Sequence, residues 1–192
     1  MPNTSATGGY LAPSTTTTPL EGNTLVDFLQ AWVAGITGIA GQYIRPRWQP
    51  EPPNIPSESV DWVAFGITKR TPDTFAAELH FGAGDGYNEL RRHEVLEMLV
   101  SFYGPNADLN ASLFRDGIQI DQNREVLVAQ NMGLVETGEP IAAPELFKEK
   151  WLYRVDLPLS IRRQIVRDYT VQNILTSNGT LDNEHYITPI VN

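Results

Sequence analysis

The stretch from residue 78 to residue 94 contains two histidines and three glutamates, and an enzyme hypothesis for this chain has to start from its histidines. If the segments on either side of the glycine-rich stretch GAGDG pair as a hairpin, Glu78, His80, His93 and Glu94 approach one another. Imidazole and carboxylate are ligand types that suit a transition metal. Successive strand residues point to opposite faces, however, so His93 and Glu94 diverge. We therefore favour the interpretation that these four residues are ordinary polar residues at the edges of strands, not metal ligands.

The other catalytic patterns are missing from the sequence. The glycines Gly82, Gly84 and Gly86 are not followed by the Lys and Ser or Thr of a phosphate-binding loop, and they join two strands instead of opening a helix. No G-x-S-x-G or other nucleophile motif occurs. We predict no catalytic residue, no metal and no cofactor. A metal-dependent or hydrolytic enzyme on the sheet around His80 and His93 stays as the alternative.

Alternating charges mark the chain after residue 151 and form its second chemical feature. Such alternation usually belongs to a solvated sheet face. Arginine also offers a planar fork that suits carboxylates, so salt bridges between subunits are the other interpretation. A tryptophan in a proline-rich stretch would be left in water unless it contacted a partner. The predicted subunit-interface residues are Trp48, Arg154, Arg162, Arg163 and Arg167.

A long strand must position those arginines. Residues 151–171, WLYRVDLPLSIRRQIVRDYTV, alternate apolar and polar side chains, which is the period-two pattern of a strand with one buried face. A helix from Ser160, with Ile161, Ile165 and Tyr169 four residues apart, is the competing interpretation of the second half. We favour the strand because Val, Ile, Tyr and Thr fit a pleated surface.

The length of this strand bears on function. At about 3.3 Å per residue the strand would span about 70 Å. A compact domain of this chain length has a diameter of only about 40 Å. The strand must therefore bend or leave the domain, and Pro158 predicts a bulge or an edge position at the break. The half beyond Pro158 then projects as an arm that pairs with a neighbouring subunit. Two ordinary strands with a kink between them are the alternative.

Other segments supply the rest of an α+β domain: an antiparallel (mixed) sheet with a long C-terminal strand, flanked by helices. A helix is predicted from the N-cap Asn23 to Gly38 or Gly41. Strands are predicted over 60–68, 74–81 and 91–103, helices over 106–117 and 121–131, and a turn region over 136–144. The predicted inward residues are Phe75, Ala77, Leu79 and Phe81 of the second strand and Leu96, Met98, Val100 and Phe102 of the third.

The chain divides into three regions. Residues 1–21 are predicted to be a flexible N-terminal arm, because they hold too little apolar surface to offset the entropy of ordering. Residues 22–175 form a single domain in which 45–59 is a proline-rich loop, extended and non-helical. Residues 176–192 are predicted to be a C-terminal tail.

The amino-acid composition and the net charge exclude some classes of protein. Of the 192 residues, 41% are hydrophobic and 19% charged, which is typical of a globular protein. The net charge of −9 argues against a nucleic-acid clamp but allows an acidic wall that DNA slides past. There is no cysteine, as suits a cytosolic protein. We expect neither a signal peptide nor a membrane span, because no apolar run approaches the length of about 18 residues that a span needs.

Three stretches carry a resemblance to a known family. They are NTLVDFLQAWVAGITGI, RRHEVLEMLVSFYGPNADLNASLFRDGIQIDQNREVLVAQNMGLVETGEP and EKWLYRVDLPLSIRRQIVRDYTVQNI. From residue 23 to about residue 180 the chain resembles the neck and tail-terminator proteins of contractile-tailed bacteriophages. The resemblance rests on the order of elements and on the SFYGPNA and RVDLPLSIRRQ phrases. The proline-rich loop and the Thr-rich arm have no match in it.

The resemblance implies a structural protein of the virion neck, or collar, without catalytic residues. It implies a homo-oligomeric ring, expected to be a hexamer, that ends the tail tube and sheath and docks to the head connector or gateway proteins. DNA would pass through the lumen without sequence-specific binding, and no membrane is involved. The protein would reside in the virion tail and neck, and in the host cytoplasm during assembly. A monomeric adaptor or binding module with Trp48 in its binding surface is the alternative from another class.

Overall fold

Two strands much longer than the others run side by side through the whole molecule. The computed structural model describes residues 3–14, 20–51, 54–147 and 149–174. Its seven-stranded mixed sheet has the order β1-β2-β4-β9-β5, with β3 also paired to β4 and β6 to β9, and a separate hairpin joins β7 to β8. The α+β class predicted from the sequence is confirmed.

The elements follow one another in this order: α1 (Gly22–Thr37), η1 (Gly41–Tyr43), β1 (Ile44–Pro46), β2 (Trp62–Pro72), β3 (Ala77–Phe81), β4 (Tyr87–Tyr103), α2 (Ala107–Gly117), α3 (Asp121–Val128), β5 (Met132–Thr137), β6 (Ile141–Ala142), β7 (Glu145–Phe147), β8 (Lys150–Leu152) and β9 (Arg154–Tyr169).

The long C-terminal strand is confirmed as one continuous element. β9 pairs with β4 from Arg154 opposite Tyr103 to Tyr169 opposite Asn88, with no shift of register. A helix after Ser160 and a kink between two shorter strands are therefore both wrong. Because side chains alternate along a strand, the uniform register keeps the same face of β9 toward the helices over its whole buried length.

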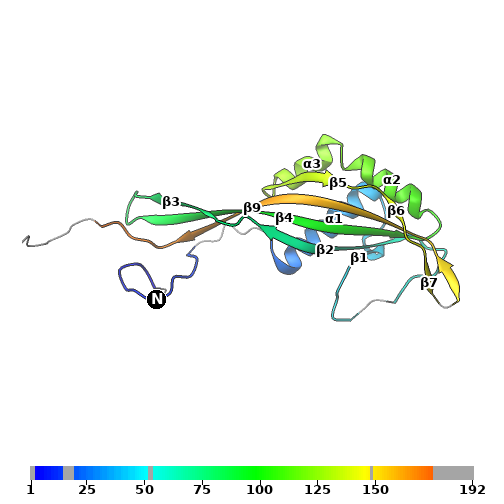
Figure 1. Ribbon diagram of the computed structural model, residues 1–192, viewed down its shortest axis with the longest axis horizontal. Helices are drawn as coiled ribbons and strands as arrows, with labels where there is room; N and C mark the ends of the chain where they lie inside the picture. The colour runs from blue at the N-terminus through cyan, green and yellow to red at the C-terminus, as the bar shows by residue number, and fades with distance from the viewer. Residues whose placement is uncertain (1–2, 15–19, 52–53, 148, 175–192) are drawn as a thin grey trace, which may run out of the picture.

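β2 and β3 lie end to end along the other edge of β4. β2 ends with Pro72 opposite Glu94, and β3 begins with Ala77 opposite Arg91, so both run antiparallel to β4. Together with β9 they form a ribbon three strands wide. Figure 1 shows that the helices cover only one part of this ribbon, while β3 and the paired ends of β4 and β9 extend beyond them. We call residues 77–92 and 164–174 the projecting ribbon.

Pro158 does not break the strand. It lies opposite Leu99 within the uninterrupted register, and its carbonyl accepts a hydrogen bond from the Gly138 N–H at 2.8 Å. In a strand the N–H and C=O of one residue point to the same side, so the N–H that proline lacks would have faced the edge between β5 and β6. No ladder bond is lost there, because β5 ends opposite Leu159 and β6 lies opposite Asp156 and Val155.

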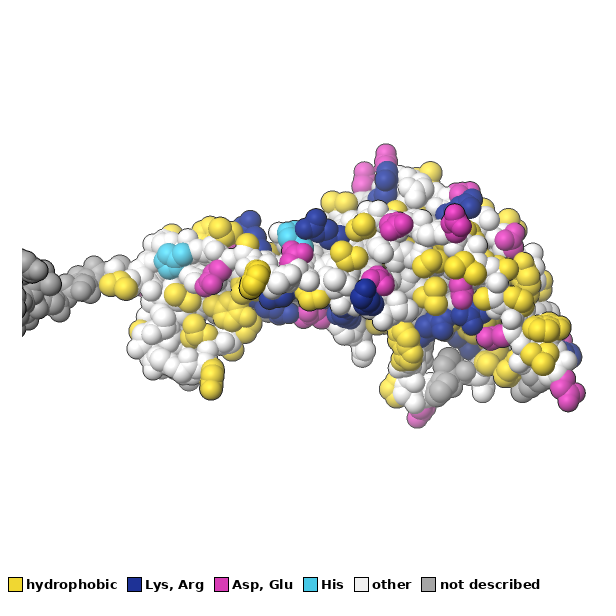
Figure 2. Space-filling model, in the orientation of Figure 1, with side chains coloured by type: hydrophobic (Ala, Val, Ile, Leu, Met, Phe, Trp, Pro, Cys, Tyr) yellow, Lys and Arg dark blue, Asp and Glu magenta, His cyan; other side chains and the backbone are white. Residues whose placement is uncertain are grey.

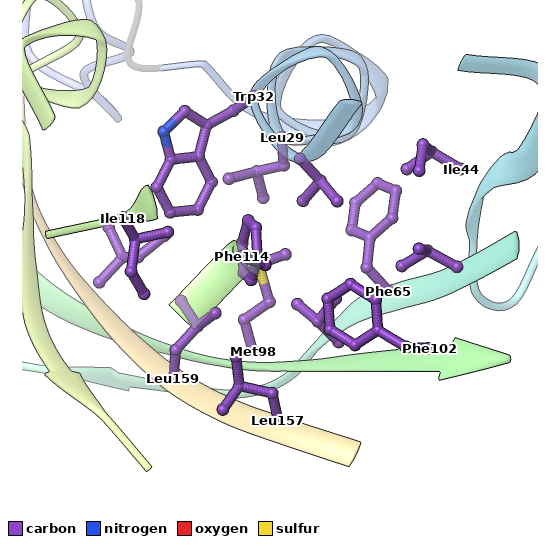
Figure 3. Packing of buried hydrophobic residues seen from close by; sticks show 14 of the residues in the cluster. Leu29, Trp32, Ile44, Phe65, Met98, Phe102, Phe114, Ile118, Leu157 and Leu159 are labelled. Carbon is purple, nitrogen blue, oxygen red and sulfur yellow. The ribbon is translucent and has the colours of Figure 1, made fainter. Parts of the chain in front are cut away.

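The hydrophobic core lies between one face of the sheet and the three helices. The four residues predicted to face inward from β4 are buried, as are the odd-numbered apolar residues of β9 from Val155 to Ile161. Trp32 of α1 meets Phe114 of α2 edge to face at 5.5 Å, and Phe102 of β4 packs against the same ring at 5.8 Å (Figure 3). Burying each such side chain stabilises the folded state by roughly 1.5–3 kcal/mol. These contacts hold α1 and α2 to the sheet.

The start of α1 differs from its prediction. The helix begins at Gly22 with Glu21 in the N-cap position, and the Thr24 hydroxyl donates to the Glu21 carbonyl at 2.7 Å. Asn23 lies inside the first turn, so its prediction as the N-cap is wrong. The predicted end at Gly38 is confirmed, since Gly38 has a left-handed φ of 72° and its N–H bonds to the Ala34 carbonyl at 2.9 Å.

The predicted strand over residues 74–81 differs more from the structure. Phe75 precedes β3 and is 87% exposed, and β3 itself has no fully buried residue. The inward set Phe75, Ala77, Leu79 and Phe81 is therefore wrong, because no helix covers this part of the ribbon. The small β7–β8 hairpin was not predicted, and the predicted turn region 136–144 contains the end of β5 and all of β6.

The described part of the N-terminal arm lies beside the projecting ribbon. The Ser5 N–H bonds to the Thr170 carbonyl at 3.1 Å, and the Ser14 N–H bonds to the Asp168 carbonyl at 2.8 Å. The Gln172 N–H donates to the Ser5 hydroxyl at 2.7 Å. The predicted tail 176–192 lies outside the described residues.

One glycine is essential to the path from β4 into α2. Gly104 has a φ of 105°, and a Cβ there would lie 2.6 Å from Oδ1 of Asp61 and 2.7 Å from the Val60 carbonyl oxygen. Asp61 in turn accepts hydrogen bonds from the N–H of Asn106 at 2.9 Å and from its Nδ2 at 2.8 Å. The start of α2 is thus fixed by Asp61, from a distant loop, instead of by a side-chain cap from Asn106.

We predict that Gly104→Ala lowers the free energy of unfolding by roughly 1–3 kcal/mol, because alanine is strained at this φ and its Cβ meets the Asp61 loop. Gly133→Ala in β5 is the matched control: a Cβ there has open space, so the change should stay below about 1 kcal/mol. Urea unfolding of both variants measures the difference. Equal stability of the two variants would contradict the prediction.

Candidate functional site

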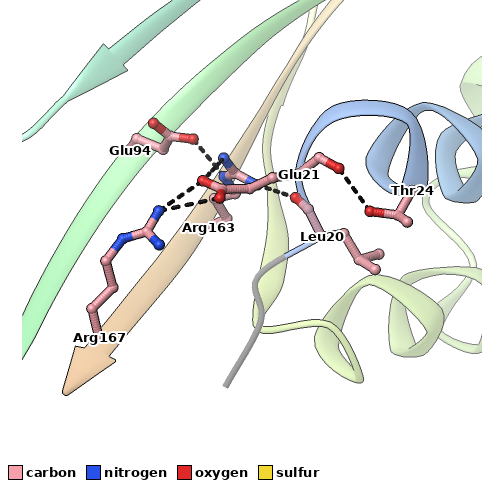
Figure 4. Close-up of polar contacts among 6 residues, drawn as sticks. All are labelled: Leu20, Glu21, Thr24, Glu94, Arg163 and Arg167. Carbon is pink, nitrogen blue, oxygen red and sulfur yellow. Dashed lines mark hydrogen bonds and ion pairs between the residues drawn. The ribbon is translucent and has the colours of Figure 1, made fainter. Parts of the chain in front are cut away.

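Arg163 lies inside the subunit instead of on its surface. Only 2% of the residue is exposed. Its Nε donates to the carboxylate of Glu94, itself buried, and its Nη1 donates to the Leu20 carbonyl. Nη2 lies 3.7 Å from Oε1 of Glu21 (Figure 4). A side chain this buried presents almost no surface to another subunit, which counts against the predicted role of Arg163 as a subunit-interface residue.

Arg167 joins the same group of charges. Its Nη2 donates to both carboxylate oxygens of Glu21, at 3.0 and 3.2 Å. Glu21 is the N-cap residue of α1, so the two arginines of β9 tie the start of the first helix to the sheet (Figure 4). We call Leu20, Glu21, Glu94, Arg163 and Arg167 the root cluster, because it lies where the ribbon leaves the helices.

Arg154 is also engaged within its own subunit. Its Nε and Nη2 bind the two carboxylate oxygens of Asp156, each at 2.7 Å, and its Nη1 lies 3.1 Å from Glu145. The hydrogen bonds to Asp156 raise the pKa of Arg154 above its ordinary value. The guanidinium lies over the ring of Tyr103 at 5.6 Å, and burial raises the pKa of the Tyr103 hydroxyl. Arg154 therefore stays charged and is held in one orientation.

Arg162 and Trp48 differ from those three arginines. Arg162 is exposed on the face opposite Arg163, and its side chain has no hydrogen bond or ion pair within the described residues. Trp48 is 72% exposed. Of the five predicted interface residues, these two are the ones whose side chains remain available to another molecule.

The two histidines are not brought together. His80 pairs with Asn88 across the β3–β4 hairpin, whereas His93 pairs with Gln164 of β9. Asn88 and His93 are separated along β4 by about 16 Å at the usual rise per residue. The carboxylate of Glu94 is engaged by Arg163. The expected approach of Glu78, His80, His93 and Glu94 is therefore wrong, and no group of three potential metal ligands occurs in the part of the chain that the structure describes.

His80 instead belongs to a polar network at the tip of the projecting ribbon. Its Nδ1 lies 2.6 Å from Oδ1 of Asn88, and its Nε2 lies 2.8 Å from Oδ1 of Asn173. Both partners are acceptors, so the doubly protonated ring fits best, and these hydrogen bonds raise the pKa of His80. Asn173 also donates to the carbonyls of Gly82 and Gly84 at 2.9 and 3.1 Å. The glycine-rich loop thus wraps around a residue that follows β9.

Sequence reasoning missed the role of Asn173 and of Glu21. Neither residue stands in a motif, and each acts on a segment about ninety or more positions away. The single signal in the sequence was the glycine spacing of GAGDG, which predicted a tight loop but not what the loop holds.

The buried pair of the root cluster leads to a stability prediction. Arg163→Met should lower the free energy of unfolding by roughly 3–5 kcal/mol, because it leaves the Glu94 carboxylate buried without its cation. Arg163→Met combined with Glu94→Leu should recover most of that loss, because no uncompensated charge remains. Urea unfolding of the single and double variants measures both effects. A double variant no more stable than the single one would show that the carboxylate is not the cause.

The tip network leads to a prediction on pH. Because the folded-state pKa of His80 is raised, the protonated ring supports the tip below the ordinary value of 6.5, and that support is lost as the pH rises through the folded-state pKa. NMR titration of the His80 ring should give a pKa above 6.5. Asn173→Ala should lower this pKa, whereas Asn110→Ala on α2 should leave it unchanged. A His80 pKa at or below 6.5 in the unmodified protein would refute the network.

The comparisons with known proteins identify the family of the chain. A family model described as phage neck terminator protein matches residues 23–184. The matched span runs from the first turn of α1 through β9 and includes most of the root cluster and both sides of the ribbon. No curated protein matches the sequence, and no helix within the described ranges combines the length and hydrophobicity of a transmembrane span. The resemblance noted in the sequence is confirmed: the chain belongs to the phage neck terminator protein family.

Proposed function

We propose that this protein forms a ring that ends the tail tube and sheath and joins the tail to the head connector. Family membership supports the coarser part of the statement, a structural role in the neck of the virion. The ring, the hexameric number, the contractile tail and the passage of DNA through a lumen are our inference from the resemblance. Because the family consists of structural neck proteins, we also propose that this protein is not an enzyme.

The observation that carries the proposal is the projecting ribbon. Beyond Ile165 no residue of β9 is fully buried, and β4 has no fully buried residue before Glu94. A monomer gains little by extending strands past its core, since strands with no packed face contribute little stability. An arm of this kind is well suited to contact a neighbouring subunit or the ring below it.

The charges support a channel for DNA. The chain carries 23 acidic and 14 basic residues, and in the structure the root cluster and the Asp156 pair occupy three of the arginines of β9. Cations that are neutralised inside the subunit do not bind phosphates. A lumen built from such subunits would let DNA move without a strong attractive contact.

In a closed ring, the contacts of each interface residue are repeated at every subunit interface. In a closed ring every subunit uses the same pair of different surfaces, so one substitution changes every interface. Trp48 and Arg162 are our candidates for these surfaces, since both are exposed. Arg154, Arg163 and Arg167 instead shape the subunit that presents them.

We predict that Arg162→Glu leaves the unfolding free energy within about 0.5 kcal/mol of the unmodified protein, because the residue is exposed and makes no ion pair with any described residue. In phage that rely on the variant, negatively stained particles should show overlong or headless tails. Arg70→Glu, an exposed arginine of β2, is the matched control and should give normal particles. Normal tails joined to heads with Arg162→Glu would place the ring contact elsewhere.

A further inference from the structure

A cavity of about 350 Å³ lies on the face of the sheet that the helices leave open. Its walls come from β1, from the loop that follows β1 and from the start of β2. Figure 2 shows Lys and Arg side chains gathered below the sheet at this end of the molecule, beside hydrophobic groups. We call it the indole–arginine pocket, after Arg45, Arg47, Trp48 and Trp62.

Within the part of the chain that the structure describes, two buried N–H groups of this pocket's residues have no acceptor. They are Nε of Arg47 and Nε1 of Trp62, and Trp62 is only 7% exposed. A buried donor without an acceptor costs about 1–3 kcal/mol. Most buried polar groups in proteins are paired with protein groups or with ordered water, so two such donors mark this pocket as incompletely paired within the described residues.

The two arginines of the pocket also have no carboxylate partner among the described residues. Arg45 donates to the Asn54 carbonyl and lies over the Trp62 ring at 5.7 Å. Arg47 donates to the hydroxyl of Ser101, which in turn donates to Asp156. The Asp156 carboxylate is already bound at both oxygens by an arginine of β9. Within the described residues neither Arg45 nor Arg47 forms an ion pair, so the pocket is positively charged.

Trp48 adds a strained backbone to the same site. Its φ of 58° is in the left-handed region, which is unfavourable for a bulky side chain. The loop brings its indole close over the sheet, since a Cβ on Gly66 would lie 2.7 Å from Cζ3 of Trp48. Strain of this kind usually persists where it serves binding. The free subunit gains little from it, because most of the indole faces water.

A second surface of the chain has the complementary character. The outer side of α2, α3 and β5 exposes apolar residues where no other element packs: Leu109, Leu113, Ile120, Val126, Val128 and Val135. Among these lie Asp108 and Glu125, exposed carboxylates that form no ion pair within the described residues. An apolar patch with unpaired acidic groups fits a pocket with exposed indole and unpaired arginines.

The two surfaces lie on opposite sides of the body. In Figure 1, α2 and α3 lie above the sheet, whereas the loop between β1 and β2 descends below it. Contacts between unlike surfaces on opposite sides generate closed rings when the rotation closes. A contact of a surface with itself, as in a twofold dimer, would not use both of them.

We propose that the indole–arginine pocket of one subunit receives a carboxylate from the α2–α3 surface of a second copy of this chain. Glu125 or Asp108 enters between Arg45 and Arg47, and the Trp48 indole covers the apolar residues around it. The carboxylate supplies the ion-pair partner that Arg45 and Arg47 lack within the described residues. This inference rests on the proposed ring and assigns one pair of its contacting surfaces, to which Trp48 belongs.

The first test identifies what occupies the pocket. A photoreactive benzoylphenylalanine replaces Trp48, the phage is assembled with this full-length protein, and irradiated particles are analysed by mass spectrometry. The expected cross-link joins the benzoylphenylalanine at position 48 to a peptide within residues 106–137 of a second copy. A cross-link to another virion protein, to another segment of this chain, or to nothing overturns the inference.

The second test uses charge. Glu125→Arg with Asp108→Arg should lower the yield of particles with normally ended tails by about tenfold or more, because the pair is broken at every interface. Adding Arg45→Glu and Arg47→Glu should restore a large part of that yield. Asp27→Arg, an exposed acidic residue of α1 outside both surfaces, is the matched control and should have no effect. No loss in the acidic-residue variant, or no recovery in the combined variant while it still folds, overturns the pairing.

Immunogold labelling separates this inference from the proposed function. Label at the head-proximal end of the tail, together with a cross-link elsewhere, rejects the pocket and leaves the neck function intact. Absence of label at that end rejects the proposed function itself.

Discussion

The pairing of β4 with β9 is the constraint on which the other elements depend. Sixteen consecutive residue pairs, from Asn88 opposite Tyr169 to Tyr103 opposite Arg154, keep one register. That register decides which side chains meet the helices and which remain open. It also places Glu94 opposite Arg163, so that a buried charge pair forms at the point where the hydrophobic core ends. A shift by one residue would exchange the two faces and remove both the core and this pair.

Much of the fold could be predicted because periodicity is a local signal. The alternation of β9, the inward set of β4 and the extents of α1 and α2 all follow from patterns within twenty residues. The errors share one physical cause, which is that burial depends on what lies opposite. Phe75 and Leu79 alternate as a half-buried strand does, but the helices end before they reach β3. Arg163 looks like an interruption of an apolar face, and only the fold brings Glu94 and Glu21 to it.

The interaction surfaces were less predictable for the same reason. Four arginines of β9 look alike in the sequence, yet three form ion pairs within the subunit, and Arg162 forms none with the residues that the structure describes. Trp48 was recognisable as a large apolar residue in a proline-rich loop. Its left-handed backbone and the unpaired donors beneath it could not be inferred, since they depend on β1 lying parallel to β2. Family membership adds the biological setting, a phage neck, to surfaces that the chain alone leaves without a partner.

The projecting ribbon has a mechanical consequence. It is a single layer three strands wide, so bending it out of its plane compresses no packed core and requires little force. A pull along its length is different, because the interstrand hydrogen bonds lie across that direction and are loaded in shear together instead of one after another. Described parts of the N-terminal segment bond to the ribbon through Ser5, at Thr170, through Ser14, at Asp168, and through Glu21, at Arg167. The projecting ribbon is therefore compliant sideways and resistant to stretching along its length.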